Sequence, residues 1–302
     1  MHVRRTFAEL SVEEIFLPWV AHFLRRGRLA LVLGSGISYG SDLPSWEVLL
    51  DRMFSAESVG KPDTTDLKLM AEMFRSRVCK GDREVFLEKV HAALYESHNP
   101  DLAVLRREET LTALSSFLLS SKRGTATNVV TYNYDDLLER YLVSCGLAVE
   151  PIFDPSHWIN DVDVSIHHPH GYLPFNDKLP RSFDIVLDRR SYNRLLTEGG
   201  DKWIEEISTI MRTHFCLFVG ISLKDERFDA IIDMVGSRHI ALKEGHAAWG
   251  VAFKTAGESV DSSAWADRGV YAKELGSYTE LPDALLRIVR RAAEVQLDEF
   301  SS

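Results

Sequence analysis

One short segment near the N-terminus constrains the fold of this chain more than any other. Residues 29–33 form an apolar run, Leu-Ala-Leu-Val-Leu, and Gly34, Ser35 and Gly36 follow at once. An apolar run that ends in a glycine turn is typical of a buried parallel strand leading into a helix. Glycine lets the backbone approach a phosphate closely, and the start of a helix favours an anion. We therefore predict a nucleotide pocket that begins at Gly34.

The spacing of the glycines leaves the identity of the nucleotide open. The next glycine is Gly40, so the pattern Gly34-x-Gly36-x-x-x-Gly40 is one residue longer than the usual dinucleotide fingerprint. A strand and turn that bind nothing are the alternative interpretation of this segment alone.

Charge argues against one class of partner. The 302 residues are 45% hydrophobic and 26% charged, which is ordinary for a globular protein, and the net charge is −10. Binding to a nucleic-acid backbone depends on Lys and Arg, so we expect no strong direct nucleic-acid binding. The basic residues Arg25, Arg26 and Arg28 are explained by the negative pole at the end of a predicted helix.

Cysteine usage and the N-terminus indicate a cytoplasmic protein. Cys79, Cys145 and Cys216 lie far apart without a C-x-x-C pair, so we expect neither a zinc cluster nor a disulfide framework. The first residues lack the apolar core of a signal peptide. No apolar run approaches the roughly 18 residues that span a bilayer. We therefore predict a cytoplasmic location and no membrane contact.

Apolar periodicity predicts helices and strands in alternation. Ser11-Val-Glu-Glu14 has the pattern of a capping box, and Ser45 is expected to cap a later helix. Helices are predicted near 11–27, 45–50, 66–74, 83–95, 109–119, 136–143, 191–212 and 282–295, and strands at 29–33, 128–135, 149–153, 164–168, 184–187, 214–220 and 247–253.

This order indicates an α/β fold, a Rossmann-like parallel sheet with helices on both faces and a helical insertion. We predict a single domain over 1–302. Residues 28–44 and 125–302 form its core, 45–124 a helical insertion or lid, and 1–27 an N-terminal helix.

Polar residues and glycines follow four of the predicted strands. In a parallel sheet, ligands bind beyond the carboxyl ends of the strands, near the topological switch point. We interpret these residues as not needed for packing and predict that they line one pocket. They are Gly34 and Ser35, Asn133 and Asp135, His170 and Gly171, and Gly220 and Ser222.

The ordered set of motifs resembles the sirtuin-like superfamily, in particular its divergent bacterial branch, which includes NAD-consuming phage-defence effectors. The turn at Gly34, Gly36 and Ser38 is similar to the opening motif of that family. Residues 131–135, Thr-Tyr-Asn-Tyr-Asp, are similar to its Thr-Gln-Asn-Ile-Asp motif, and His170-Gly171 to its catalytic His-Gly. The Leu-Pro-Ser-Trp segment at 43–46 and the blocks at 185–192 and 218–225 match the bacterial branch.

One departure from the family bears on the reaction. Family deacylases generally carry two zinc-binding cysteine pairs between the His-Gly motif and the later strand, and this chain has only Cys216 there. We therefore expect no zinc module, and peptide deacylation becomes the less favoured activity.

The resemblance implies an NAD glycohydrolase that cleaves the nicotinamide–ribose bond of its substrate NAD. Asn133 would orient the ribose or the attacking water, and His170 would act as the general base. Asp135 would brace the catalytic loop. The diphosphate would be cradled by Gly34, Ser35, Gly36 and Ser38, and the adenosine end would be bordered by Gly220 and Ser222.

Each assignment has an alternative. Asn133 could be an ordinary turn residue after a strand. His167, His168 and His170 could form a metal cluster, although no cysteine or carboxylate stands nearby at ligand spacing. Asp225 is explained as a carboxylate at the start of a helix, and Trp46 as a core residue.

The whole chain could also serve other functions. Besides an NAD hydrolase of anti-phage defence, we keep open a regulatory module that binds NAD or ADP-ribose without cleavage, and a protein ADP-ribosyltransferase or deacylase. Free NAD hydrolysis would drain the host, and no sensor segment is evident. We therefore expect control through a homo-oligomer or a separately encoded partner, such as a nucleic-acid-handling protein.

Overall fold

A computed structural model describes residues 5–119, 126, 128–156, 161–192, 200–221, 223, 225–238, 248–255 and 262–298. Within these residues, seven strands form one sheet in the order β3-β4-β2-β1-β5-β6-β7, and every neighbouring pair is parallel. The predicted Rossmann-like α/β architecture is therefore confirmed. The strands are β1 (Leu29–Leu33), β2 (Asn128–Thr131), β3 (Val149–Ile152), β4 (Val164–His167), β5 (Phe215–Val219), β6 (Gly250–Thr255) and β7 (Val270–Leu275).

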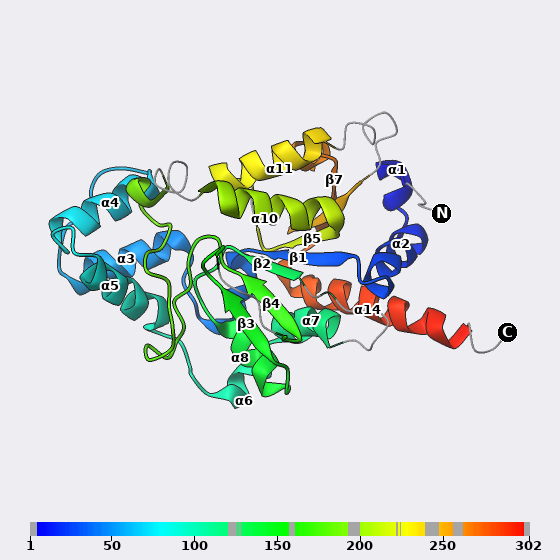
Figure 1. Ribbon diagram of the computed structural model, residues 1–302, viewed down its shortest axis with the longest axis horizontal. Helices are drawn as coiled ribbons and strands as arrows, with labels where there is room; N and C mark the ends of the chain where they lie inside the picture. Colours follow the sequence, from blue (N-terminus) through cyan, green and yellow to red (C-terminus); the bar gives the residue numbers. More distant parts are fainter. Residues whose placement is uncertain are drawn as a thin grey trace.

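Helices cover both faces of the sheet (Figure 1). Leu29, Leu31 and Leu33 of β1 pack into one core with α2, α7, α8 and α14, whereas Ala30 and Val32 face a second core with α10, α11 and α13. The described helices are α1 (Phe7–Leu10), α2 (Glu13–Arg25), α3 (Trp46–Ala56), α4 (Leu67–Arg77), α5 (Arg83–Tyr95), α6 (Leu102–Leu105), α7 (Glu109–Leu118), α8 (Leu137–Ser144), α10 (Gly200–Thr213), α11 (Glu226–Arg238), α13 (Ser262–Ala266) and α14 (Leu281–Asp298), with the 3₁₀ helices η1 (Ser35–Ser41) and η2 (Tyr278–Glu280).

The helices of the predicted insertion divide between two places. In Figure 1, α3, α4 and α5 lie together beyond the end of β1, on the side where the glycine turn begins. Ser45 accepts a hydrogen bond from the amide of Val48, so it caps α3 as predicted. By contrast, α7 packs against α14 and α8, in the layer that covers the sheet. The boundaries of the insertion stay a prediction.

Two local predictions are wrong. Residues 184–187 form no strand, because they cross the fold as a bent segment whose Val186 amide donates to the His170 carbonyl oxygen at 2.8 Å. The capping box lies at Thr6 and Glu9, at the start of α1, and the residue that caps α2 is Val12, without a side-chain hydrogen bond.

The last strand, β7, was not predicted from the sequence. It runs along the edge of the sheet, and only its first and last residues, Val270 and Leu275, are buried. A strand of this kind shows no continuous apolar run, so the pattern that revealed the central strands is missing from it.

Candidate active site

A cavity of about 700 Å³ opens at the carboxyl ends of β1, β2 and β5. Because β1 lies between β2 and β5, this is the switch point of the sheet, where ligands of such folds bind. The volume is within the roughly 300–1,000 Å³ typical of small-molecule sites. Of the residues predicted for the pocket, those that line it are Gly34, Ser35, Gly36, Ser38, Asn133, Asp135, His170 and Gly220.

One predicted residue, Ser222, lies outside the described residues. Gly171, which follows His170, does not line the cavity. It has a φ of +104°, a conformation that glycine adopts without strain.

The glycines are needed for packing, which corrects the prediction that they are not. The amides of Gly34 and Gly36 donate to the carbonyl oxygens of Val219 and Gly220, each at 3.0 Å. A Cβ on Gly36 would lie 2.7 Å from the Gly220 Cα, so the two turns meet only because both residues are glycine. These two amides are bonded to the last residue of β5 and to the residue after it, so a diphosphate would be held by other groups of the cavity.

Asn133 is held so that one side-chain atom stays available. Its amide donates to Thr131 Oγ1 at 3.2 Å, and its Nδ2 donates to Ser38 Oγ at 3.1 Å. Among the described residues, no hydrogen bond uses Asn133 Oδ1. The carboxamide oxygen is therefore an oriented acceptor for a hydroxyl group or a water molecule in the cavity.

Asp135 connects the glycine turn to α8. Its Oδ2 accepts a hydrogen bond from Ser38 Oγ at 3.3 Å, and its Oδ1 accepts one from the Leu137 amide at 3.2 Å. Burial and the nearby carboxylate of Glu139 together raise the pKa of Asp135 to about 7, against the Leu137 amide, which lowers it. Burial likewise raises the pKa of Asp136 to about 6.

His170 stands among aromatic rings and one carboxylate. Its ring centroid is 4.8 Å from that of Tyr132 and 5.7 Å from that of Tyr192. Its Nε2 is 3.5 Å from Asp225 Oδ2, which also accepts a hydrogen bond from Tyr192 Oη at 2.6 Å. Asp225 Oδ1 accepts from the Phe228 amide at 2.9 Å, so this carboxylate caps α11 as predicted and faces His170 as well.

An apolar wall closes the side of the cavity next to α3, α4 and α5. Trp46 stacks with Tyr192 at a centroid distance of 6.4 Å, with the ring planes 9° apart. Its Nε1 has no hydrogen-bond partner among the described residues. The sequence interpretation of Trp46 as a core residue is therefore incomplete. The apolar residues of this wall are Leu43, Trp46, Leu49, Leu67 and Leu94.

The three neighbouring histidines face three different partners. His167 Nδ1 is 3.0 Å from Glu206 Oε1, His168 Nε2 is 2.6 Å from Glu139 Oε1, and His170 faces the large cavity. They therefore do not form the metal cluster considered above. Within the described residues, no group of three or more histidine, cysteine or acidic side chains could hold a metal ion.

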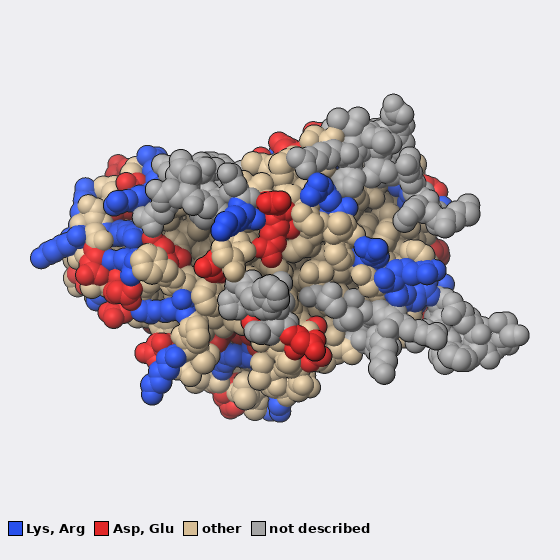
Figure 2. Space-filling model, in the orientation of Figure 1, with Lys and Arg blue, Asp and Glu red and all other residues tan. Residues whose placement is uncertain are grey.

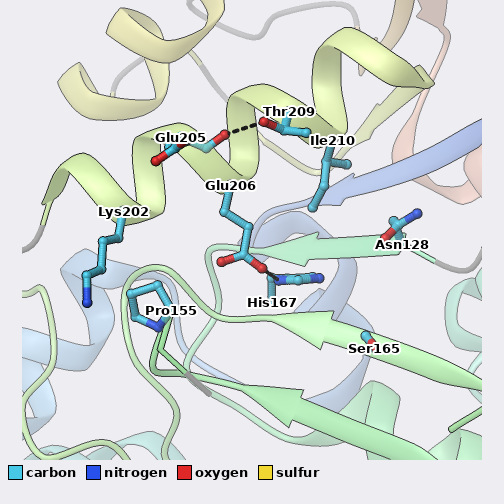
Figure 3. Close-up of a pocket in the computed structure, with 9 residues that line it drawn as sticks. All are labelled: Asn128, Pro155, Ser165, His167, Lys202, Glu205, Glu206, Thr209 and Ile210. Atoms are coloured by element: carbon cyan, nitrogen blue, oxygen red, sulfur yellow. Dashed lines mark hydrogen bonds and ion pairs between the residues drawn. The ribbon is translucent and has the colours of Figure 1, made fainter. Parts of the chain in front are cut away.

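A second, smaller hollow of about 420 Å³ lies between α10 and β4 (Figure 3). The pair of His167 and Glu206 lies at its centre, and Lys202 approaches from α10, where its Nζ donates to Ser156 Oγ at 2.8 Å. This hollow contains none of the residues predicted for the ligand site.

The surface shows mixed charges. Figure 2 shows acidic and basic side chains interspersed, with one group of basic side chains over α2, whose C-terminal end carries Arg25 and the exposed residues Arg26 and Arg28. No helix among the described residues combines the length and the apolar character needed to cross a membrane.

Fold and cavity together define a Rossmann-like protein with a cavity at the switch point of its sheet. Residues 127–272 match the family model of the SIR2-like domain. No curated protein matches the chain significantly in sequence. The solved structure described as "Structural Basis for the Mechanism and Regulation of Sir2 Enzymes" is similar in fold, with 16% identity, a TM-score of 0.50, and coverage of 93% of this chain and 98% of that one.

Residues 127–272 are therefore similar to the SIR2-like domain, and the chain is similar in fold to a Sir2 enzyme structure, in agreement with the resemblance of its motifs. The matched range contains Asn133, Asp135, His170 and Gly220, whereas the glycine turn after β1 and Trp46 lie before it.

Proposed function

We propose that this chain hydrolyses NAD at the nicotinamide–ribose bond and releases nicotinamide and ADP-ribose, or its cyclic form. One observation carries the proposal. Asn133 and His170, which come from the ends of two different strands, line the same cavity as the glycine turn, and the Oδ1 of Asn133 is available there. A site for bond cleavage needs an orienting group and a base in one cavity, and Asn133 and His170 would supply them.

The proposed reaction makes few demands on the protein. The bond between ribose C1′ and the nicotinamide nitrogen breaks, and its electron pair leaves with neutral nicotinamide. Asn133 Oδ1 would accept a hydrogen bond from a ribose hydroxyl or from the attacking water and so align it with C1′. A water oxygen then bonds to C1′, and His170 takes up the released proton. The carboxylate of Asp225, 3.5 Å from Nε2, would stabilise the imidazolium that forms.

The apolar wall would hold the nicotinamide end of the substrate. Trp46 and Tyr192 offer aromatic faces against which a flat ring stacks favourably. The Trp46 Nε1 hydrogen is available to an acceptor such as the carboxamide oxygen of nicotinamide. The apolar wall would also limit the access of bulk water to the reacting carbon from that side, so that one positioned water attacks.

In the cell, this activity would deplete NAD. From the resemblance to phage-defence effectors, we propose that the chain is the toxic effector of a bacterial defence system. Its activity would be restrained by assembly into a homo-oligomer or by a separately encoded partner until infection. A purified chain that is a fully active monomer would overturn this part of the proposal.

The test is nicotinamide release from NAD by the wild type, Asn133→Ala and His170→Ala, with and without the protein encoded next to this chain. His167→Ala is the matched control, because His167 is a neighbouring histidine that faces Glu206 and not the large cavity. We expect release by the wild type and the control and a loss in both site variants. Undiminished turnover in both site variants would refute the assignment. Tight NAD binding in calorimetry without any nicotinamide formed would instead indicate a binding module.

A further inference from the structure

A buried imidazole–carboxylate pair lies directly behind the loop that carries Asn133. The side chain of His168 is 0% exposed, and that of Glu139, on α8, is 8% exposed. His168 Nε2 is 2.6 Å from Glu139 Oε1, and His168 Nδ1 is 3.1 Å from the main-chain oxygen of Asn133. Neither His168 nor Glu139 lines the large cavity, so neither has a part in the reaction proposed above.

The partners determine the protonation of the His168 ring. The main-chain oxygen of Asn133 can only accept, so Nδ1 must carry a hydrogen. Nε2 then either donates to the Glu139 carboxylate or accepts from the protonated acid. In both cases the two side chains share one proton and are neutral as a pair, and the hydrogen on Nδ1 remains directed at Asn133.

This contact completes the fixation of Asn133. The amide of Asn133 is bonded to Thr131, its side-chain Nδ2 to Ser38, and its main-chain oxygen to His168. Because the main chain is held on both sides of the Asn133 Cα and the carboxamide is held at Nδ2, the orientation of Oδ1 is fixed. A displaced Asn133 would still admit NAD to the cavity but would misalign the reacting groups.

Stability alone is a weak reason for this pair. A buried ion pair is often no more stabilising than apolar residues of similar volume. The neighbouring carboxyl groups raise the cost of a charge on Glu139 further. Asp135 and Asp136 lie just before α8, and the charge of Glu139 raises the pKa of both. Two tyrosines also lie close: the ring of Tyr172 is 4.7 Å from that of His168, and Tyr95 Oη donates to Asp136 Oδ1 at 3.3 Å.

We infer that Glu139 and His168 are positioning residues: Glu139 holds the His168 ring in place, so that the hydrogen on His168 Nδ1 stays directed at the Asn133 carbonyl oxygen and holds Asn133 in the orientation that the reaction requires. The inference rests on the proposed function. The chain itself supplies a control: His167, the residue before His168, forms a second histidine–carboxylate pair, at 3.0 Å, with Glu206 of α10, whose side chain is 26% exposed (Figure 3).

The test compares steady-state nicotinamide release by Glu139→Leu, Glu139→Gln and the control Glu206→Leu. Misplacement of a reacting group by about 1 Å lowers rates up to roughly 100-fold. For Glu139→Leu we therefore expect kcat to fall by about 10- to 100-fold, with KM changed less than about threefold. In Glu139→Gln the amide donates to Nε2 and keeps the hydrogen on Nδ1, so kcat is expected to recover to within about threefold of the wild type. Glu206→Leu should keep the wild-type kcat.

A second readout does not depend on turnover. In protein labelled with ¹⁵N-histidine, we expect NMR to show a proton on His168 Nδ1 in the wild type and in Glu139→Gln. A wild-type kcat for Glu139→Leu, or a bare Nδ1 in the wild type, would overturn the inference. If the wild type releases no nicotinamide while His168 shows the expected tautomer, the proposed function fails and the arrangement of the pair stands.

Discussion

Relative to the wild type, replacing Asp135 with Asn should stabilise the protein at pH 8 by more than it does at pH 5. Asp135 is buried and linked to Ser38 and the Leu137 amide. Burial raises its pKa from 3.8 to about 7. Between these two values the folded protein keeps a proton on Asp135 that the unfolded chain has lost. Because the folded state binds more protons, the free energy of unfolding falls as pH rises through this window.

The size of the effect follows from the two pKa values. Integrating the linkage between pH 5 and pH 8, with 3.8 in the unfolded chain and about 7 in the folded one, gives roughly 2–3 kcal/mol of lost stability from this carboxyl. Asn has nearly the same shape, still accepts from Leu137 through Oδ1, and does not ionise. The stability difference between Asp135→Asn and the wild type should therefore grow by that amount across the window.

Urea unfolding of both proteins at pH 5, 6, 7 and 8, followed by tryptophan fluorescence, measures this difference. Asp101→Asn is the control, because Asp101 caps α6 through the Ala103 amide from an exposed position. Its stability difference should change much less with pH. The reasoning is refuted if the difference for Asp135→Asn is the same at pH 5 and pH 8, or if this variant is the less stable protein at pH 8.

Three further substitutions test other parts of the structure. Gly34→Ala would place a Cβ 2.8 Å from the Ile221 Cα and should lower stability by about 1–3 kcal/mol in urea unfolding. The control Gly60→Ala, whose Cβ would meet no atom within 4 Å, should not lower it. Equal stability of the two variants would contradict the close packing of the turn at Gly34 against the turn at Gly220. Arg75→Met leaves Asp188, 1% exposed and 2.8 Å from the guanidinium, without its buried partner, and should cost about 3–5 kcal/mol in the same assay; a loss under about 1 kcal/mol would be the contrary result. Asp225→Asn keeps a capping side chain for α11 but removes the charge beside His170. The kcat for nicotinamide release should therefore fall by at least about tenfold, without a loss of thermal stability. An unchanged kcat would exclude a role for that charge.

The central part of the fold could be predicted because its strands are buried on both faces. β1 and β5 are buried at every position, so each appears in the sequence as an apolar run, and the polar residues that follow them mark one edge of the sheet. β7 carries partly exposed residues at the sheet edge and lacks this signal. The run at 184–187 has the signal but fills the core as a bent segment, which local sequence does not reveal.

The members of the site could be predicted better than the contacts that place them. Asn133 and His170 stand out as polar residues after strands, and both line the cavity. That Gly36 touches Gly220, or that Asp225 faces His170, depends on distances between segments far apart in the chain. Trp46 was interpreted as a core residue because its helical spacing fits a packed face equally well. Its position in the cavity wall depends on how α3 meets Tyr192.

The most direct test of the account is to incubate the chain with NAD in ¹⁸O-labelled water and to identify the products by mass spectrometry. The incubation is done once with the chain alone and once with the protein encoded next to it added. The account predicts one nicotinamide for each NAD consumed, together with ADP-ribose that carries one ¹⁸O at the ribose C1′, or with unlabelled cyclic ADP-ribose. Intact NAD in both incubations, or ADP-ribose found covalently attached to protein, would contradict it.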